Sequence, residues 1–83
     1  MEAELRTILK NAGRLGAVAD TIDPRADLFA SGLSSLATVD VMLAVEDAFG
    51  VEFPDALLCR RTFRTLSSLG GVVGNLREVA AAR

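Results

Sequence analysis

The stretch GLSSLATVDVMLAVEDAF, residues 32–49, decides how this chain folds. Two adjacent serines open it, and ten of the fourteen residues that follow Ser35 are apolar. Serine is a preferred residue at the start of a helix, and Gly50, directly after the run, is a preferred residue at a helix end. The pattern therefore predicts a helix that begins at Ser34 or Ser35 and ends at Phe49.

The predicted helix carries two stripes at helical spacing. One is purely apolar and is expected to face the core: Val39, Met42, Val45 and Phe49. The other mixes leucine with aspartate: Leu36, Asp40, Leu43 and Asp47. A helix of a small domain cannot bury both stripes, so the mixed stripe is expected to be exposed and to bind partner proteins.

The flanking segments predict further helices. Their expected bounds are 2–12, about 54–60, and from Leu66 onward after an N-cap at Thr65. Weak signals and a turn at Asp23 and Pro24 predict a loop over 14–26, followed by one short turn at Leu28 and Phe29. The expected fold is all-α, a small bundle of three longer helices and one short one.

Composition supports one small helical domain, residues 1–83. The core must be aliphatic, because the chain has four Phe and no Trp or Tyr. A single cysteine excludes an internal disulfide. Charges interrupt the first ten residues, and no run of 18 apolar residues occurs, so neither a secretory signal nor a membrane span is expected. We expect a soluble, monomeric protein of the cytoplasm.

Charge is unevenly distributed along the chain. Residues 27–59 hold six acids and no Lys or Arg, whereas the remainder holds nine bases and five acids, a net charge of +4. An acidic centre argues against nucleic-acid binding by this segment. The chain has no His, and its acids are scattered, so neither a His-based catalyst nor a metal site is expected.

One serine is enough to cap the helix. If Ser34 is the cap, Ser35 lies in the first turn with a free hydroxyl, where the helix dipole and unpaired N–H groups favour a bound phosphate ester. The competing interpretation is that both serines are only structural.

The segment DLFASGLSSLATVDVMLAVEDAFGVEFPD, residues 27–55, resembles the signature region of acyl and peptidyl carrier proteins. The resemblance implies a carrier that is not itself an enzyme, with 4′-phosphopantetheine attached to Ser35 by a phosphopantetheinyl transferase. It also implies that the mixed stripe binds such partners. Other matching positions are Asp40, Glu46, Asp47, Phe49, Phe53, Pro54 and Asp55.

Ser34 departs from the family pattern, which usually has Asp at this place. Together with LLCRR at 57–61 and Phe63, this resembles a smaller group of stand-alone carriers. The resemblance implies an aminoacyl cargo loaded by a ligase related to seryl-tRNA synthetases. An acyl carrier of fatty acid or polyketide synthesis, loaded by an acyltransferase, is the alternative, and an unmodified helical interaction module is a third interpretation. Cys59 is expected to be core filling, or else a reactive thiol beside Arg60 and Arg61.

Overall fold

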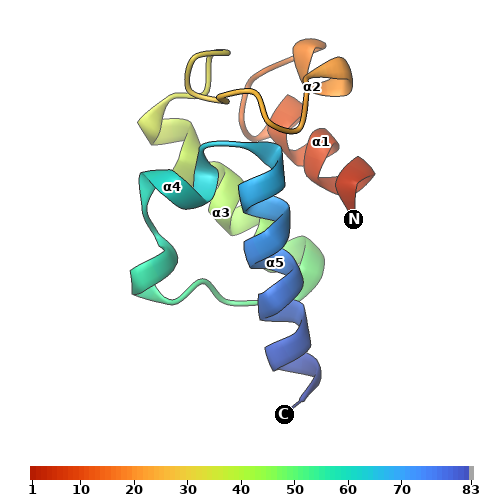
Figure 1. Cartoon of the computed structure of the whole chain (residues 1–83), viewed down its shortest axis with the longest axis vertical. Coiled ribbons are helices and arrows are strands. Elements are labelled where there is room, and N and C mark those ends of the chain that lie inside the picture. Colours follow the sequence, from red (N-terminus) through yellow and green to blue (C-terminus); the bar gives the residue numbers. More distant parts are fainter. Residues whose placement is uncertain (83) are drawn as a thin grey trace.

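In the computed structural model, which describes residues 1–82, every regular element is a helix (Figure 1). The order along the chain is α1 (Glu2–Asn11), α2 (Val18–Thr21), α3 (Ser35–Phe49), the 3₁₀ helix η1 (Asp55–Leu57), α4 (Arg60–Phe63) and α5 (Leu66–Ala81). The predicted all-α fold with three longer helices is confirmed.

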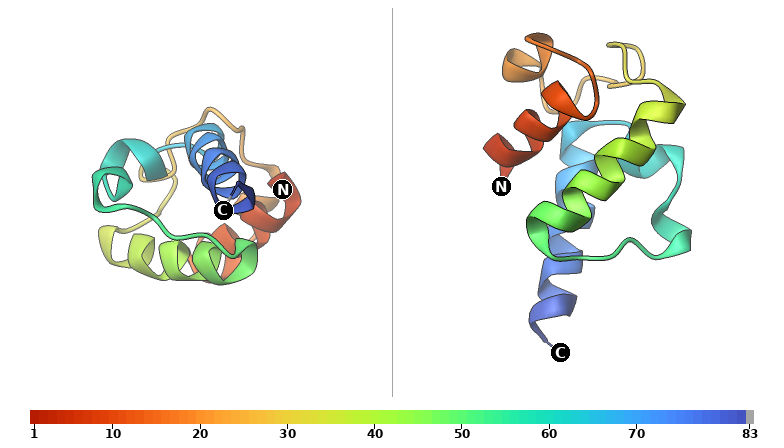
Figure 2. Two further views of the ribbon diagram at one scale, coloured as in Figure 1. Left: turned by 90° about the horizontal axis from the view of Figure 1, so that it is seen from below. Right: turned by 180° about the vertical axis from the view of Figure 1, so that it is seen from behind.

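The three longer helices enclose a mainly aliphatic core. Seen end-on in the left panel of Figure 2, α5 lies between α1 on one side and α4 on the other, with α3 across from it. The large side chains that are fully buried come mainly from these helices: Leu5, Leu9, Leu28, Val41, Val45, Leu69 and Val73. Burying a Val or Leu side chain stabilises the fold by about 1.5–3 kcal/mol, so this cluster accounts for much of the driving force.

The short elements differ from the sequence prediction. Residues 14–26, predicted as a loop, contain the four-residue helix α2. The helix predicted for 54–60 is two pieces, η1 and α4, because Leu58 and Cys59 leave the helical region with ψ of 66° and 162°. Phe53 and Phe63 pack on each other across this connection, with ring centroids 5.7 Å apart.

The predicted core face of α3 is partly wrong. Val45 is buried, and Met42 and Phe49 pack against the core, but Val39 is 49% exposed. The face that is buried is formed by Ala37, Val41 and Val45. The predicted stripe is rotated by about one position from the buried face, because α3 is apolar nearly all round and hydrophobicity alone does not select its inner face.

The ends of α3 and α5 follow the expected chemistry. Gly50 ends α3 in the left-handed conformation, with φ of 65°. Thr65 caps α5 and forms a capping box with Ser68, so the predicted N-cap is confirmed. The last turns of α5 extend beyond the other helices in Figure 1, where Val79 is 54% exposed.

Candidate functional site

The two serines at the start of α3 have different roles. Ser34 is the N-cap, with extended backbone, and its Oγ accepts a hydrogen bond from the Ala37 N–H at 3.0 Å. The predicted cap is therefore confirmed at Ser34. Ser35 is the first residue of the helix, and its side chain is exposed.

The surroundings of Ser35 suit an anionic group. Within residues 1–82, no protein group forms a hydrogen bond with the Ser35 hydroxyl, and the first turn of α3 holds no acid. The unpaired N–H groups and the dipole at a helix N-terminus stabilise negative charge. A phosphodiester on this oxygen would meet neither a carboxylate of its own turn nor a steric barrier from buried neighbours.

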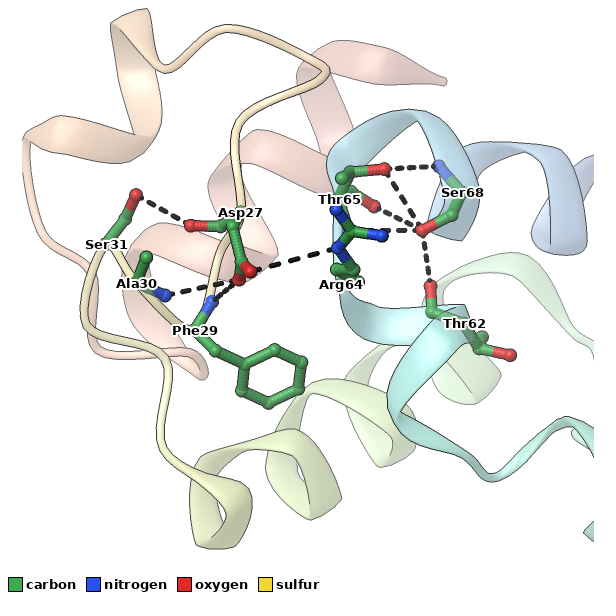
Figure 3. A network of polar contacts seen from close by, with 8 residues as sticks. All are labelled: Asp27, Phe29, Ala30, Ser31, Thr62, Arg64, Thr65 and Ser68. Atoms are coloured by element: carbon green, nitrogen blue, oxygen red, sulfur yellow. Dashed lines mark hydrogen bonds and ion pairs between the residues drawn. The ribbon is translucent and has the colours of Figure 1, made fainter.

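The segment before the serines is tied down at both ends. Asp27 begins it, and the Oδ1 atom accepts the N–H groups of Phe29 at 2.9 Å and Ala30 at 3.2 Å (Figure 3). Its other carboxylate oxygen lies 3.8 Å from Arg64, whose carbonyl accepts the Leu28 N–H at 2.7 Å. The turn predicted at Leu28 and Phe29 is thereby confirmed, and it is fixed to the junction of α4 and α5.

Sequence reasoning missed these attachments. The guanidinium of Arg60 lies 4.0 Å above the ring of Phe29, a cation–π contact that joins α4 to the same turn. An Asp side chain that accepts the backbone N–H group two residues later is a recognisable local signal. The partners Arg60 and Arg64, however, are more than thirty residues away in the chain. At its other end, the segment is held by Leu33, which is 3% exposed.

An apolar ridge runs along the outer face of α3. It consists of Leu36, Val39 and Leu43, which are 75%, 49% and 53% exposed. The predicted exposure of Leu36 and Leu43 is confirmed, and Val39 joins them although it was expected in the core. A ridge of three exposed apolar residues on one helix is a feature of surfaces that another protein covers.

The acids of α3 differ in their surroundings. Asp40 is half-buried and pairs with Arg14, whose Nη2 lies 2.8 Å from a carboxylate oxygen. Glu46 accepts the N–H of Phe53 at 2.9 Å and so anchors the connector after α3. The side chain of Asp47 is exposed, and within residues 1–82 it forms no hydrogen bond or ion pair. The pairing of Asp40 and the anchoring by Glu46 were not expected from the sequence.

A small hollow lies between α3 and the start of α4. It has a volume of about 220 Å³ and is lined by Thr38, Val39, Met42, Leu58 and Phe63. Two of its lining residues, Val39 and Leu58, are 49% and 43% exposed, so the hollow is a depression of the surface.

Cys59 is not core filling, as had been expected, because it is exposed. The side-chain hydrogen bond with Thr62, whose Oγ1 lies 3.6 Å from the sulfur, is the main cause that lowers the pKa of the Cys59 thiol. The backbone N–H of Thr62 and the charge of Arg61 act in the same direction. The thiolate form of Cys59 is therefore more populated at a given pH than in an ordinary cysteine.

Within the described residues, no group of three His, Cys, Asp or Glu side chains could hold a metal ion. None of the helices described is long and apolar enough to cross a membrane.

Comparison with known proteins defines the class. The family profile described as "Phosphopantetheine attachment site" matches residues 3–73. The chain therefore belongs to the phosphopantetheine-binding carrier protein family. It is a phosphopantetheine-dependent carrier and not a catalyst, with the fold that its sequence predicted.

Individual relatives are more specific. The chain is 47% identical over 73 residues, 88% of either protein, to the aminoacyl carrier protein of Agrobacterium fabrum strain C58. It matches a chain in the crystal structure of an engineered Bradyrhizobium japonicum glycine:[carrier protein] ligase complexed with carrier protein from Agrobacterium tumefaciens and AMP. That match has a TM-score of 0.84 and 46% identity, and covers 89% of this chain and 99% of the other.

A solution structure from Agrobacterium tumefaciens is also similar. Its TM-score is 0.76 at 42% identity, and the match covers 100% of both chains. The likeness thus extends through the whole chain, beyond the segment that carries the serines.

Proposed function

We propose that Ser35 is the attachment residue and that the protein carries an amino acid as a thioester on the attached arm. The observation that supports attachment at Ser35 is that the two serines have different roles. Ser34 is the helix cap, whereas Ser35 has a free, exposed hydroxyl. In the transfer, the Ser35 oxygen attacks the β-phosphorus of coenzyme A. The bond to the leaving 3′,5′-adenosine diphosphate breaks, and a base of the transferase takes the hydroxyl proton.

Phosphopantetheine supplies a terminal thiol at the end of a flexible arm, and the cargo is held on that thiol as a thioester. The chain's own contribution is to present that arm on a fixed helix end. The segment 27–33 serves this purpose, because Asp27, Arg64 and Leu33 hold it on both sides of the exposed residues.

The aminoacyl cargo is supported by the relatives, one of which is an aminoacyl carrier protein and another of which is bound to a glycine:[carrier protein] ligase with AMP. A ligase that uses ATP and an amino acid is accordingly the proposed loading enzyme. Coenzyme A and ATP are both cytoplasmic, which fits a carrier working in that compartment. The proposed docking surface is Leu36, Asp40, Leu43 and Asp47, together with Val39.

The attachment is tested by intact mass after incubation with coenzyme A and a promiscuous phosphopantetheinyl transferase. Wild type and Ser34→Ala should each gain one phosphopantetheine, and Ser35→Ala should gain none while remaining helical by circular dichroism. Ser34→Ala is the matched control, because it removes the neighbouring hydroxyl. Modification of Ser35→Ala would refute the assignment, and a wild type that is never modified would favour an unmodified interaction module.

The cargo needs a separate experiment on the modified protein. It is offered in parallel a glycine:[carrier protein] ligase with ATP and amino acids, and a malonyl transferase with malonyl-coenzyme A. Aminoacyl product with the ligase is the expected result. Efficient malonyl loading without aminoacyl product would assign the protein to fatty acid or polyketide synthesis and leave Ser35 as its attachment residue.

A further inference from the structure

Arg14 has an unusual backbone conformation. Its φ of 58° is the one left-handed value of a residue other than glycine within residues 1–82. Glycine or asparagine normally occupies such a position, because a Cβ atom there meets the neighbouring carbonyl. The chain has glycines nearby, at Gly13 and Gly16, yet a long cationic side chain occupies the left-handed position. Such an outlier points to a role for the side chain.

The side chain of Arg14 reaches α3. Its Nη2 lies 2.8 Å from the carboxylate of Asp40, and the two side chains are 61% and 45% exposed. Asp40 lies on α3 one turn after Leu36 and just under one turn before Leu43, the two most exposed residues of the apolar ridge. The guanidinium is therefore on the same surface as the ridge.

The pairing changes the electrostatic character of that surface. The sequence gives α3 three acids and no base. Glu46 accepts a hydrogen bond from the backbone of Phe53, and the carboxylate of Asp40 is paired with the guanidinium of Arg14. Asp47 remains as the acid that a cationic partner can bind without first displacing a protein group. Charge complementarity sets which proteins meet productively more than how tightly they bind.

We propose that Arg14 is a specificity-determining residue of the α3 docking surface, which shields Asp40 from cationic side chains of partners. The partner that fits best presents an apolar groove for Leu36 and Leu43. Opposite Asp40 it presents a neutral or acidic group, and its cation faces Asp47. This inference rests on the proposed function, because it assumes that partners dock on α3.

The experiment measures kcat/KM for attachment of phosphopantetheine from coenzyme A by a promiscuous, cation-rich transferase, as a function of NaCl concentration. The variants are Arg14→Gln, Asp40→Asn and the double variant. Unshielding Asp40 in Arg14→Gln should raise kcat/KM on the order of threefold at low salt and steepen its decline with salt. The increase should be absent when Asp40 is Asn.

Lys10→Gln is the matched control for net charge. Lys10 forms a comparable exposed pair with Asp20 at 3.1 Å, which joins α1 to α2 and includes no residue of α3, so its loss should leave kcat/KM unchanged. Arg14→Gly controls for the backbone, because it removes the side chain and relieves the left-handed strain. It should show the same rise in kcat/KM as Arg14→Gln and unfold at a temperature no lower than that variant.

The proposal is overturned if Arg14→Gln lowers kcat/KM, which would mean that Arg14 itself binds the partner. It is equally overturned if the change persists in the Asp40→Asn background or matches that of Lys10→Gln. If wild type is not modified at all, the proposed function has failed, and that outcome is distinct because it does not depend on Arg14.

Discussion

Asp27 should stabilise residues 27–33, the segment before Ser35, mainly by capping the turn at Leu28 and Phe29. Its ion pair with Arg64 should contribute only slightly. One carboxylate oxygen accepts the N–H groups of Phe29 and Ala30, at 2.9 and 3.2 Å. Removing a side-chain cap costs about 0.5–2 kcal/mol. The pair with Arg64 is long, at 3.8 Å, and Arg64 is 65% exposed, so that pair contributes at most a few tenths of a kcal/mol. Asp27→Ala should therefore destabilise the protein by about 1–2 kcal/mol.

Thermal unfolding followed by circular dichroism measures this difference. For a domain of this size, 1 kcal/mol corresponds to roughly 4–8 °C in Tm, so Asp27→Ala should lower Tm by about 5–15 °C. Asp27→Asn keeps the acceptor oxygen and should lower Tm by only a few degrees, as should Arg64→Ala. At a temperature where all variants are folded, Asp27→Ala should also be modified more slowly at Ser35. If Arg64→Ala is as destabilising as Asp27→Ala, the reasoning about the cap is wrong.

Three further predictions follow from burial, thiol chemistry and backbone conformation. In urea titrations, Leu9→Ala should lower the free energy of unfolding by about 2–5 kcal/mol, because Leu9 is 0% exposed. Leu36→Ala should change it by less than about 0.5 kcal/mol, because Leu36 is 75% exposed. Iodoacetamide should alkylate Cys59 with a pH midpoint below that of an ordinary thiol. Thr62→Val should move this midpoint upward, because the side-chain hydrogen bond that favours the thiolate is lost. An unchanged midpoint would exclude the Thr62 hydroxyl as the cause. Gly50→Ala should cost about 1–2 kcal/mol from its φ of 65° alone, since nothing lies within 4 Å of an added Cβ.

Local chemistry made part of this structure predictable. The start of α3 follows from the cap at Ser34, its end from Gly50, and the start of α5 from Thr65. Each of these depends on residues only a few positions apart. The exposed hydroxyl of Ser35 was predictable for the same reason, because one cap satisfies one helix end.

Contacts between distant residues were not predictable in this way. The attachment of the turn at Asp27 depends on Arg64, and the neutralisation of Asp40 depends on Arg14, 26 residues earlier. A charge count along the chain treated residues 27–59 as uniformly acidic. It could not show that bases from outside the segment reach two of its acids. The short helix α2 was missed because its four residues carry little periodic signal.

The error at Val39 has a different origin, and it bears on function. A helix that only packs against a core has one apolar face and one polar face, which makes its inner face easy to identify. In α3, the buried face is Ala37 and Val41 with Val45, and a second apolar face carries Leu36 and its neighbours into solvent. Because the side chains of the second face are about half exposed or more in the free protein, they contribute less to folding than the buried face does. The docking of partner enzymes proposed above would cover that face. On that proposal, the ambiguity that misplaced Val39 arises because one helix serves both the core and the partners.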